Sequence, residues 1–252
     1  METAHAPWRP PDVPSDWPDR FFGPFFLEVT RRLGKYETTQ ADAALLEAML
    51  GLERGAAILD VPCGFGRFSS ILHARGYRVT GIDSSQFLLE EARRRNPGPV
   101  YVLGDMRAPP AGPFDAVLNL WTSFGYFSEP TEDLAALAAW AAALRPGGQL
   151  VMEFSDLERA TLENRVGSEE HSYRRHADND VLAETWIDWR SNLVTVSYSM
   201  DGRTVTTRTR VYSKEQLADM FKHVGFASLE FFGGFDQRPK RPQDRLVIQA
   251  YK

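Results

Sequence analysis

Two glycines and two carboxylates stand where successive apolar segments of the chain end. Residues 57–61 form a short apolar run that leads into Gly64 and Gly66, and a helical pattern follows directly. A ligand can lie against bare backbone at such a loop, beside the N-terminus of the helix. The next apolar run ends in Asp83, whose carboxylate can accept both hydroxyls of a ribose. Because Asp105 follows the third run in the same way, the pattern predicts a nucleoside ligand at one edge of a sheet.

A nicotinamide dinucleotide is the first alternative ligand for this loop. Its fingerprint is Gly-x-Gly-x-x-Gly, in which the third glycine lets the helix and the strand pack closely. Gly64 and Gly66 fill the first two places, but Ser69 occupies the third. The chain also carries no motif for a hydride-acceptor site. The sequence therefore disfavours a dehydrogenase.

The elements around these residues alternate between helices and strands. Helical periodicity covers residues 39–50, 66–75, 85–95 and 131–144, and a last helix begins at Ser213. Short apolar runs predict strands at 57–61, 77–82, 100–103, 114–120, 149–154, 228–232 and 245–251. This alternation predicts an α/β fold with a parallel sheet covered by helices.

The rhythm changes after residue 168. Four runs rich in Tyr, Trp, Val and Thr are separated by turn signals, and Asp201-Gly202 is the strongest of these because a tight hairpin needs positive φ at both positions. We expect a four-stranded antiparallel insertion. It divides the chain into an insertion at 161–212 and a core formed by 39–160 and 213–252.

Residues 1–38 are predicted to form an N-terminal arm. Six prolines fall within the first 24 residues, which disfavours regular structure there. The arm also carries many aromatic side chains, too many to leave in water. We therefore expect an arm or lid that docks, at least in part, on the main body.

Composition limits the partners and the compartment. The 252 residues are 43% hydrophobic and 25% charged, which is ordinary for a globular chain. The longest apolar run, 134–144, is too short to cross a bilayer, and Cys63 is the single cysteine. A net charge of −5 disfavours nucleic acid as a partner. We expect a cytoplasmic protein with no membrane, nucleic-acid or metal partner.

Five short motifs in a fixed order resemble those of class I S-adenosylmethionine-dependent methyltransferases of the small-molecule type. They are DVPCGFGR at 60–67, GIDS at 81–84, GDM at 104–106, FDAVLN at 114–119 and LRPGG at 144–148. Pro62 stands where the family usually has its first glycine. The resemblance covers residues 36–252. It implies a Rossmann-like, seven-stranded, mostly parallel sheet, an antiparallel lid insertion before the last helix, and S-adenosylmethionine as cofactor.

The resemblance also implies roles for the residues at the strand ends. The methionine part of the cofactor would lie along the loop, Asp83 would bind the ribose, and Asp105 with the amide of Met106 would read the adenine. The alternatives are a helix N-cap for Asp83, an Asx turn for Asp105 and a merely packed Cys63. The implied cofactor-binding set is Asp60, Cys63, Gly64, Phe65, Gly66, Asp83, Ser84, Asp105 and Met106.

The acceptor is expected beyond the fourth strand, where the family places methyl transfer. The aromatic loop there offers Asn119, Trp121, Ser123 and Tyr126, for which plain loop or core packing is the alternative. The insertion would roof this pocket, and otherwise it would form a homodimer interface. Its candidate lining residues are Tyr173, Trp186 and Tyr198.

No catalytic base is identified. In one branch of the family a histidine precedes the LRPGG-type turn, and here that position is Ala143. His171 and His176 lie on one predicted strand with opposite parity, so at most one faces the site, while His5 lies in the arm. The predicted reaction is in-line transfer of a methyl group to a small amine or hydroxyl compound. The alternatives are a cofactor-binding protein without transferase activity and an RNA methyltransferase.

Overall fold

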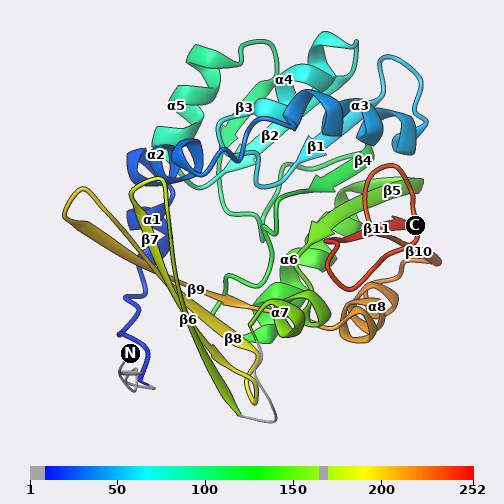
Figure 1. Ribbon diagram of the computed structural model, residues 1–252. Coiled ribbons are helices and arrows are strands. Elements are labelled where there is room, and N and C mark those ends of the chain that lie inside the picture. Colours follow the sequence, from blue (N-terminus) through cyan, green and yellow to red (C-terminus); the bar gives the residue numbers. More distant parts are fainter. Residues whose placement is uncertain (1–8, 165–169) are drawn as a thin grey trace.

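The computed structural model describes residues 9–164 and 170–252 (Figure 1). Seven strands form one sheet in the order β10-β11-β5-β4-β1-β2-β3, and β11 runs antiparallel to the other six. This confirms the predicted seven-stranded, mostly parallel sheet. The strands are β1 (Ala57–Asp60), β2 (Arg78–Asp83), β3 (Val100–Leu103), β4 (Phe114–Asn119), β5 (Leu144–Phe154), β10 (Ser228–Phe232) and β11 (Leu246–Tyr251).

Helices cover both faces of this sheet, as the alternation predicts. One core cluster includes Trp140 and Phe221 from two helices, and the other includes Leu46 and Leu72 from two more. The helices of the core are α3 (Thr39–Leu50), α4 (Arg67–Ala74), α5 (Gln86–Arg95), α6 (Pro130–Ala143), α7 (Leu157–Asn164) and α8 (Lys214–His223). The short helix α7 was not predicted from the sequence. No helix in the described ranges is both long and apolar enough to span a bilayer.

A second sheet holds the predicted four-stranded antiparallel insertion. Its order is β6-β7-β8-β9, formed by β6 (His171–Asp178), β7 (Val181–Asp188), β8 (Leu193–Met200) and β9 (Arg203–Arg210). Asp201 and Gly202 have φ values of 51° and 73° at the last hairpin, as the turn signal predicts. In Figure 1 this sheet stands beside the main sheet without joining it.

The N-terminal arm contains two helices between residues 17 and 32, which corrects the prediction that its prolines disfavour regular structure. Residues Trp17–Phe21 form α1 and residues Pro24–Arg32 form α2. Each helix has its proline in the first turn. The backbone donor that proline lacks has no partner inside the helix at that position, so proline starts these helices and does not break them.

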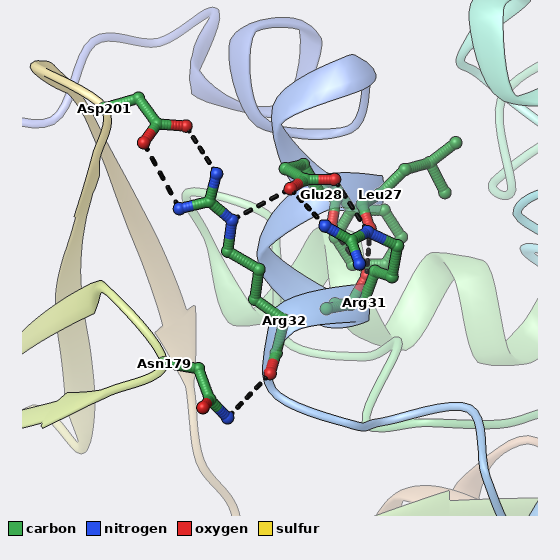
Figure 2. A network of polar contacts seen from close by, with 8 residues as sticks. Leu27, Glu28, Arg31, Arg32, Asn179 and Asp201 are labelled. Atoms are coloured by element: carbon green, nitrogen blue, oxygen red, sulfur yellow. Dashed lines mark hydrogen bonds and ion pairs between the residues drawn. The ribbon is translucent and has the colours of Figure 1, made fainter.

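The arm docks on the insertion sheet. One apolar cluster joins Trp17, Phe21 and Phe25 of the arm to Val181 and Met200 of the sheet. Polar contacts close the rim of this cluster (Figure 2): Arg32 forms an ion pair of 2.7 Å with Asp201, and the Asn179 side chain donates to the Arg32 carbonyl at 2.9 Å. The arm and the insertion therefore form one packed unit, far apart in sequence but adjacent in space.

Phe21→Ala should lower the free energy of unfolding by about 3–5 kcal/mol, the usual cost of truncating a buried phenylalanine. Phe21 is 8% exposed and its ring meets the rings of Trp17, Phe22, Phe25, Phe26 and Tyr198. Urea unfolding measures the change. Leu45→Ala is the control, because Leu45 is 41% exposed on α3 and its loss should change stability by less than about 0.5 kcal/mol. Equal effects of the two substitutions would contradict the docked arm.

Candidate functional site

A cavity of about 820 Å³ opens at the carboxyl ends of β1, β2 and β4. Its wall is built from the loop after β1, the loop after β4, the arm, and the edge of the insertion sheet. This size lies toward the upper end of the range of small-molecule sites, about 300–1,000 Å³. The carboxyl edge of a parallel sheet is where such folds place their ligands.

The loop after β1 presents bare backbone to this cavity at Gly64. A side chain added there would meet no atom within 4 Å, and the φ of 56° favours glycine. Gly66 differs, because a Cβ there would lie 2.2 Å from the Tyr101 hydroxyl oxygen. Gly66 does not line the cavity, and its missing side chain makes room for Tyr101. Cys63 and Phe65 do line the cavity, and burial raises the pKa of the Cys63 thiol well above its usual value, which disfavours a reactive thiolate.

Asp83 ends β2 and faces the cavity beside this loop. One carboxylate oxygen accepts the Gly64 N–H at 2.8 Å, and the other accepts the Ser85 N–H at 2.9 Å. The residue is 6% exposed, and burial raises the pKa of its carboxyl group. Ser85, not Asp83, caps α5, because its hydroxyl oxygen accepts the Leu88 N–H at 3.2 Å. Each carboxylate oxygen of Asp83 keeps a further lone pair for a ligand hydroxyl.

Asp60 lies at the end of β1, also on the cavity wall. It is 2% exposed and accepts a hydrogen bond from the Ser69 hydroxyl. Burial raises the pKa of its carboxyl to about 7.

The loop after β3 places Asp105 and Met106 on the opposite wall. An oxygen of Asp105 accepts the Arg107 N–H at 2.8 Å, which is an Asx turn, and the carboxylate pairs with the Arg107 guanidinium at 2.6 Å. The Met106 carbonyl accepts the indole N–H of Trp140 at 2.8 Å. Ser84 is exposed and also lines the cavity. The carboxylate of Asp105 is thus already bonded to Arg107, although Asp105 still lines the cavity where the adenine was expected.

The loop after β4 has a conformation that strand β5 imposes. Trp121 and Thr122 have φ values of 63° and 58°, which side chains rarely adopt. The Trp121 N–H donates to the Glu153 carboxylate at 3.0 Å, and the Thr122 N–H donates to the Glu153 carbonyl at 2.9 Å. The Ser155 N–H donates to the Thr122 hydroxyl at 3.1 Å. These bonds hold Trp121 against the cavity.

Arg67 supports Trp121 from the other side. Its guanidinium carbon lies 3.7 Å from the centre of the indole ring, and burial lowers the pKa of Arg67 to about 10. Tyr36 stacks on the same indole with ring centres 5.8 Å apart. Neither contact was predicted from the sequence. Arg67 directly follows Gly66 in the motif at 60–67. This position next to the loop is the one feature of the sequence that could have indicated Arg67 as a site residue.

Of the predicted acceptor residues, Trp121, Ser123 and Tyr126 line the cavity and Asn119 does not. The side chain of Asn119 is wholly buried and donates to the carbonyls of Val61, at 2.7 Å, and Ser123, at 2.9 Å. It therefore fastens the loop to β1 instead of facing a ligand.

The hydroxyl of Tyr126 donates to the Thr122 carbonyl at 3.0 Å. Its ring packs edge-on against Trp17 of the arm, with ring centres 5.5 Å apart. Burial raises the pKa of Tyr126, so its phenolate form is disfavoured.

Asp133 of α6 holds Tyr212, which follows β9 closely in the chain. It accepts the Tyr212 hydroxyl at 2.7 Å. It is fully buried, which raises the pKa of its carboxyl to about 6.

The insertion meets the cavity through β8 and β9, not through the residues predicted from the sequence. The Arg210 N–H donates to the Gly125 carbonyl at 2.7 Å, which places the edge strand β9 beside the loop after β4. Leu193 and Arg208 consequently line the cavity. The predicted Tyr173, Trp186 and Tyr198 do not, because β6 and β7 lie farther from this edge and Tyr198 stacks on Phe21 of the arm.

The histidines considered as bases do not line the cavity either. His171 lies 3.9 Å from the Asp188 carboxylate, measured from its Nδ1, and His176 is exposed. His5 lies outside the described residues.

Comparison with known proteins identifies the domain. Residues 58–148 match a family model described as a methyltransferase domain. This region therefore forms a methyltransferase domain. The chain has structural neighbours in an S-adenosylmethionine-dependent methyltransferase from Clostridium acetobutylicum (TM-score 0.71, 17% identity, 90% of this chain and 97% of that chain) and an S-adenosylmethionine-bound amino pentose methyltransferase from Micromonospora echinaspora (TM-score 0.65, 22% identity, 90% and 96%). The predicted fold is confirmed, and the methyltransferase domain agrees with the predicted family.

Curated relatives of the chain match over shorter spans. An N,N-dimethyltransferase of dTDP-3-amino-3,6-dideoxy-alpha-D-glucopyranose from Streptomyces fradiae is 37% identical over 123 residues, which are 48% of this chain and 48% of the relative. A malonyl-[acyl-carrier protein] O-methyltransferase from Serratia marcescens is 33% identical over 138 residues, which are 53% and 52%. The match thus spans about half the length of these relatives.

Proposed function

We propose that this protein transfers a methyl group from S-adenosylmethionine to a small-molecule acceptor, an amine or a hydroxyl compound, by in-line displacement. The observation that carries the proposal is one continuous cavity, which joins the bare backbone of Gly64 and the carboxylate of Asp83 to the aromatic loop at residues 121–127. The first part suits a nucleoside cofactor, and the second suits a small acceptor.

The residues of the first part fit the cofactor. The open Gly64 backbone leaves room for the methionine portion, and each oxygen of the buried Asp83 carboxylate keeps a lone pair that can accept a ribose hydroxyl. Ser84, Asp105 and Met106 are assigned to the adenine end, and Asp60, Cys63 and Phe65 to the other end. When bound, S-adenosylmethionine supplies a methyl group on a sulfonium that is already activated for transfer.

The protein's part in catalysis is to position the acceptor and exclude water. We propose that the arm, residues 1–38, and the insertion, residues 161–212, act together as the roof of the acceptor pocket, because their packed unit reaches the cavity wall at Trp17, Phe22 and Arg208. Positioning of this kind can lower a barrier by about 7–11 kcal/mol. A homodimer through the insertion is the alternative, and light scattering of the purified protein decides it.

An amine acceptor fits the cavity wall better than a hydroxyl. A neutral amine attacks without help, whereas a hydroxyl generally needs a base. Among the described residues, no histidine lines the cavity. The named relatives methylate an amino sugar and a malonyl carrier protein, so both acceptor types belong in the test.

The test is a screen of small amines and hydroxyl compounds for release of S-adenosylhomocysteine, with product mass measured in parallel. The proposal expects one S-adenosylhomocysteine for each methyl group added. Tight cofactor binding with no turnover across the screen would instead support a cofactor-binding protein without transferase activity.

Asp60 should make stability depend on pH. Its pKa is 3.8 in the unfolded reference and about 7 in the folded protein. Between these values the folded protein holds a proton that the unfolded chain has released, so the stability given by the neutral carboxyl is complete at low pH and is lost as the pH rises through about 7.

The neutral variant Asp60→Asn should therefore gain stability relative to the parent protein between pH 5 and pH 8, since it removes this titration. Urea unfolding of both proteins at the two pH values measures the difference. The other buried carboxyls are present in both proteins and cancel. A pH-independent difference would contradict the raised pKa.

A further inference from the structure

Among the described residues three arginines line the cavity, and two of them are already engaged. Arg107 forms ion pairs of 2.6 Å with the carboxylates of Asp105 and Glu132. Arg67 lies over the ring of Trp121. Arg208 is half-buried, and within residues 9–164 and 170–252 its guanidinium has no hydrogen bond, no ring contact and no carboxylate oxygen within 4.0 Å.

A second hydrogen-bond donor without an acceptor lies on the same face of the sheet, across the strands from Arg208. The strand register places Arg208 opposite Thr195, and Thr195 opposite Trp186. Trp186 is 8% exposed, and its indole N–H is buried without a hydrogen-bond partner in the described part of the chain. A guanidinium and an indole N–H therefore share one face of this sheet, and no described residue supplies an anion or acceptor to either.

Arg208 also stands at a defined distance from the expected methyl-transfer site. The Arg210 N–H is bonded to the Gly125 carbonyl in the loop after β4. Arg208 precedes Arg210 by two residues, and a strand advances about 3.3 Å per residue, so the two backbones are about 7 Å apart along β9. If one acceptor molecule contacts both places, the group bound by Arg208 lies several covalent bonds away from the atom that lies at the loop after β4.

A half-buried guanidinium without a counter-charge is poorly compensated, and its planar donors match the two oxygens of a phosphate or a carboxylate. We infer that Arg208 binds an anionic oxygen group on the acceptor, a phosphate or a carboxylate, which makes the substrate an anionic small molecule. This inference rests on the proposed function. Arg208 is then the residue that selects the acceptor and sets its direction in the cavity.

The experiment titrates inorganic pyrophosphate and malonate separately into the protein saturated with S-adenosylhomocysteine, by calorimetry. The protein should bind at least one of them, and Arg208→Gln should weaken that binding by about tenfold or more, as expected for loss of a charge-assisted contact. Pyrophosphate binding indicates a phosphate-bearing acceptor, and malonate binding indicates a carboxylate-bearing one. Binding should weaken as salt is raised.

Arg175→Gln is the matched control, because Arg175 is an exposed arginine of β6 in the same sheet and does not line the cavity. It should change anion affinity by less than about twofold, and neither variant should change the affinity for S-adenosylhomocysteine. If the parent protein binds neither anion, or if Arg208→Gln binds them as tightly as the parent, the inference is wrong. Failure of S-adenosylhomocysteine to bind would count against the proposed function instead, and the anion titrations repeated on the protein alone would still decide the role of Arg208.

Discussion

Asp83→Ala should weaken the binding of S-adenosylmethionine by more than about a hundredfold. The substitution removes the carboxylate proposed to bind the ribose and also releases the Gly64 N–H, which the carboxylate holds at 2.8 Å. Each hydrogen bond to a charged group contributes about 1.5–3 kcal/mol, so the loss of two corresponds to a hundredfold change or more in the dissociation constant. Calorimetric titration of the variant with S-adenosylmethionine measures it.

Asp115→Ala is the matched control for this prediction. Asp115, at the start of β4, also accepts a backbone N–H, from Ala57 at 2.7 Å, but it does not line the cavity. The control should bind the cofactor like the parent protein. If Asp83→Ala binds the cofactor as tightly as the parent protein, or if both variants lose affinity equally, the assignment of Asp83 to the ribose is wrong.

Gly125→Ala should reduce methyl transfer by about a hundredfold while cofactor affinity stays within about threefold. A Cβ at Gly125 would lie 2.2 Å from the Arg210 carbonyl oxygen, so β9 and the loop after β4 must move apart. Displacement of a substrate-positioning group by about 1 Å can cost about a hundredfold in rate. Turnover with the acceptor found in the screen measures the effect, and overpacking should also lower the free energy of unfolding by about 1–3 kcal/mol.

Gly202→Ala is the control that distinguishes the clash with the Arg210 carbonyl from the strain of a positive φ. Gly202 has a φ of 73°, close to the 85° of Gly125, but a Cβ at Gly202 would meet nothing within 4 Å. The two substitutions therefore share the conformational cost and differ in the clash. Equal loss of turnover in both variants would show that the junction between β9 and the loop has no special part in catalysis.

The sequence was most informative where local pattern and ligand chemistry coincide. Apolar runs beside Asp60 and Asp83 predicted two of the central strands and the edge of the sheet where the cavity opens. The hairpin at Asp201 was readable because few residue pairs tolerate its backbone. These features depend on neighbours in the chain, and so a single sequence contains them.

The sequence was least informative where contacts join distant segments. The helices of the arm were missed because Pro18 and Pro24 were judged as breakers, although the first turn of a helix accepts proline. The alternation of side chains along a strand does not show which edge of the insertion meets the core. Trp186 was therefore predicted to line the cavity, and Arg208, which does line it, was not. Asn119 has the right position, but its amide N–H groups donate to the backbone carbonyls of Val61 and Ser123.

The most direct test of the account is calorimetric titration of the purified protein with S-adenosylmethionine and S-adenosylhomocysteine, with NADH as the control ligand. The account predicts micromolar binding of the first two in a one-to-one ratio and no binding of NADH. Binding of NADH, or binding of none of the three, would contradict the assignment of the cavity beside Gly64 and Asp83 to S-adenosylmethionine.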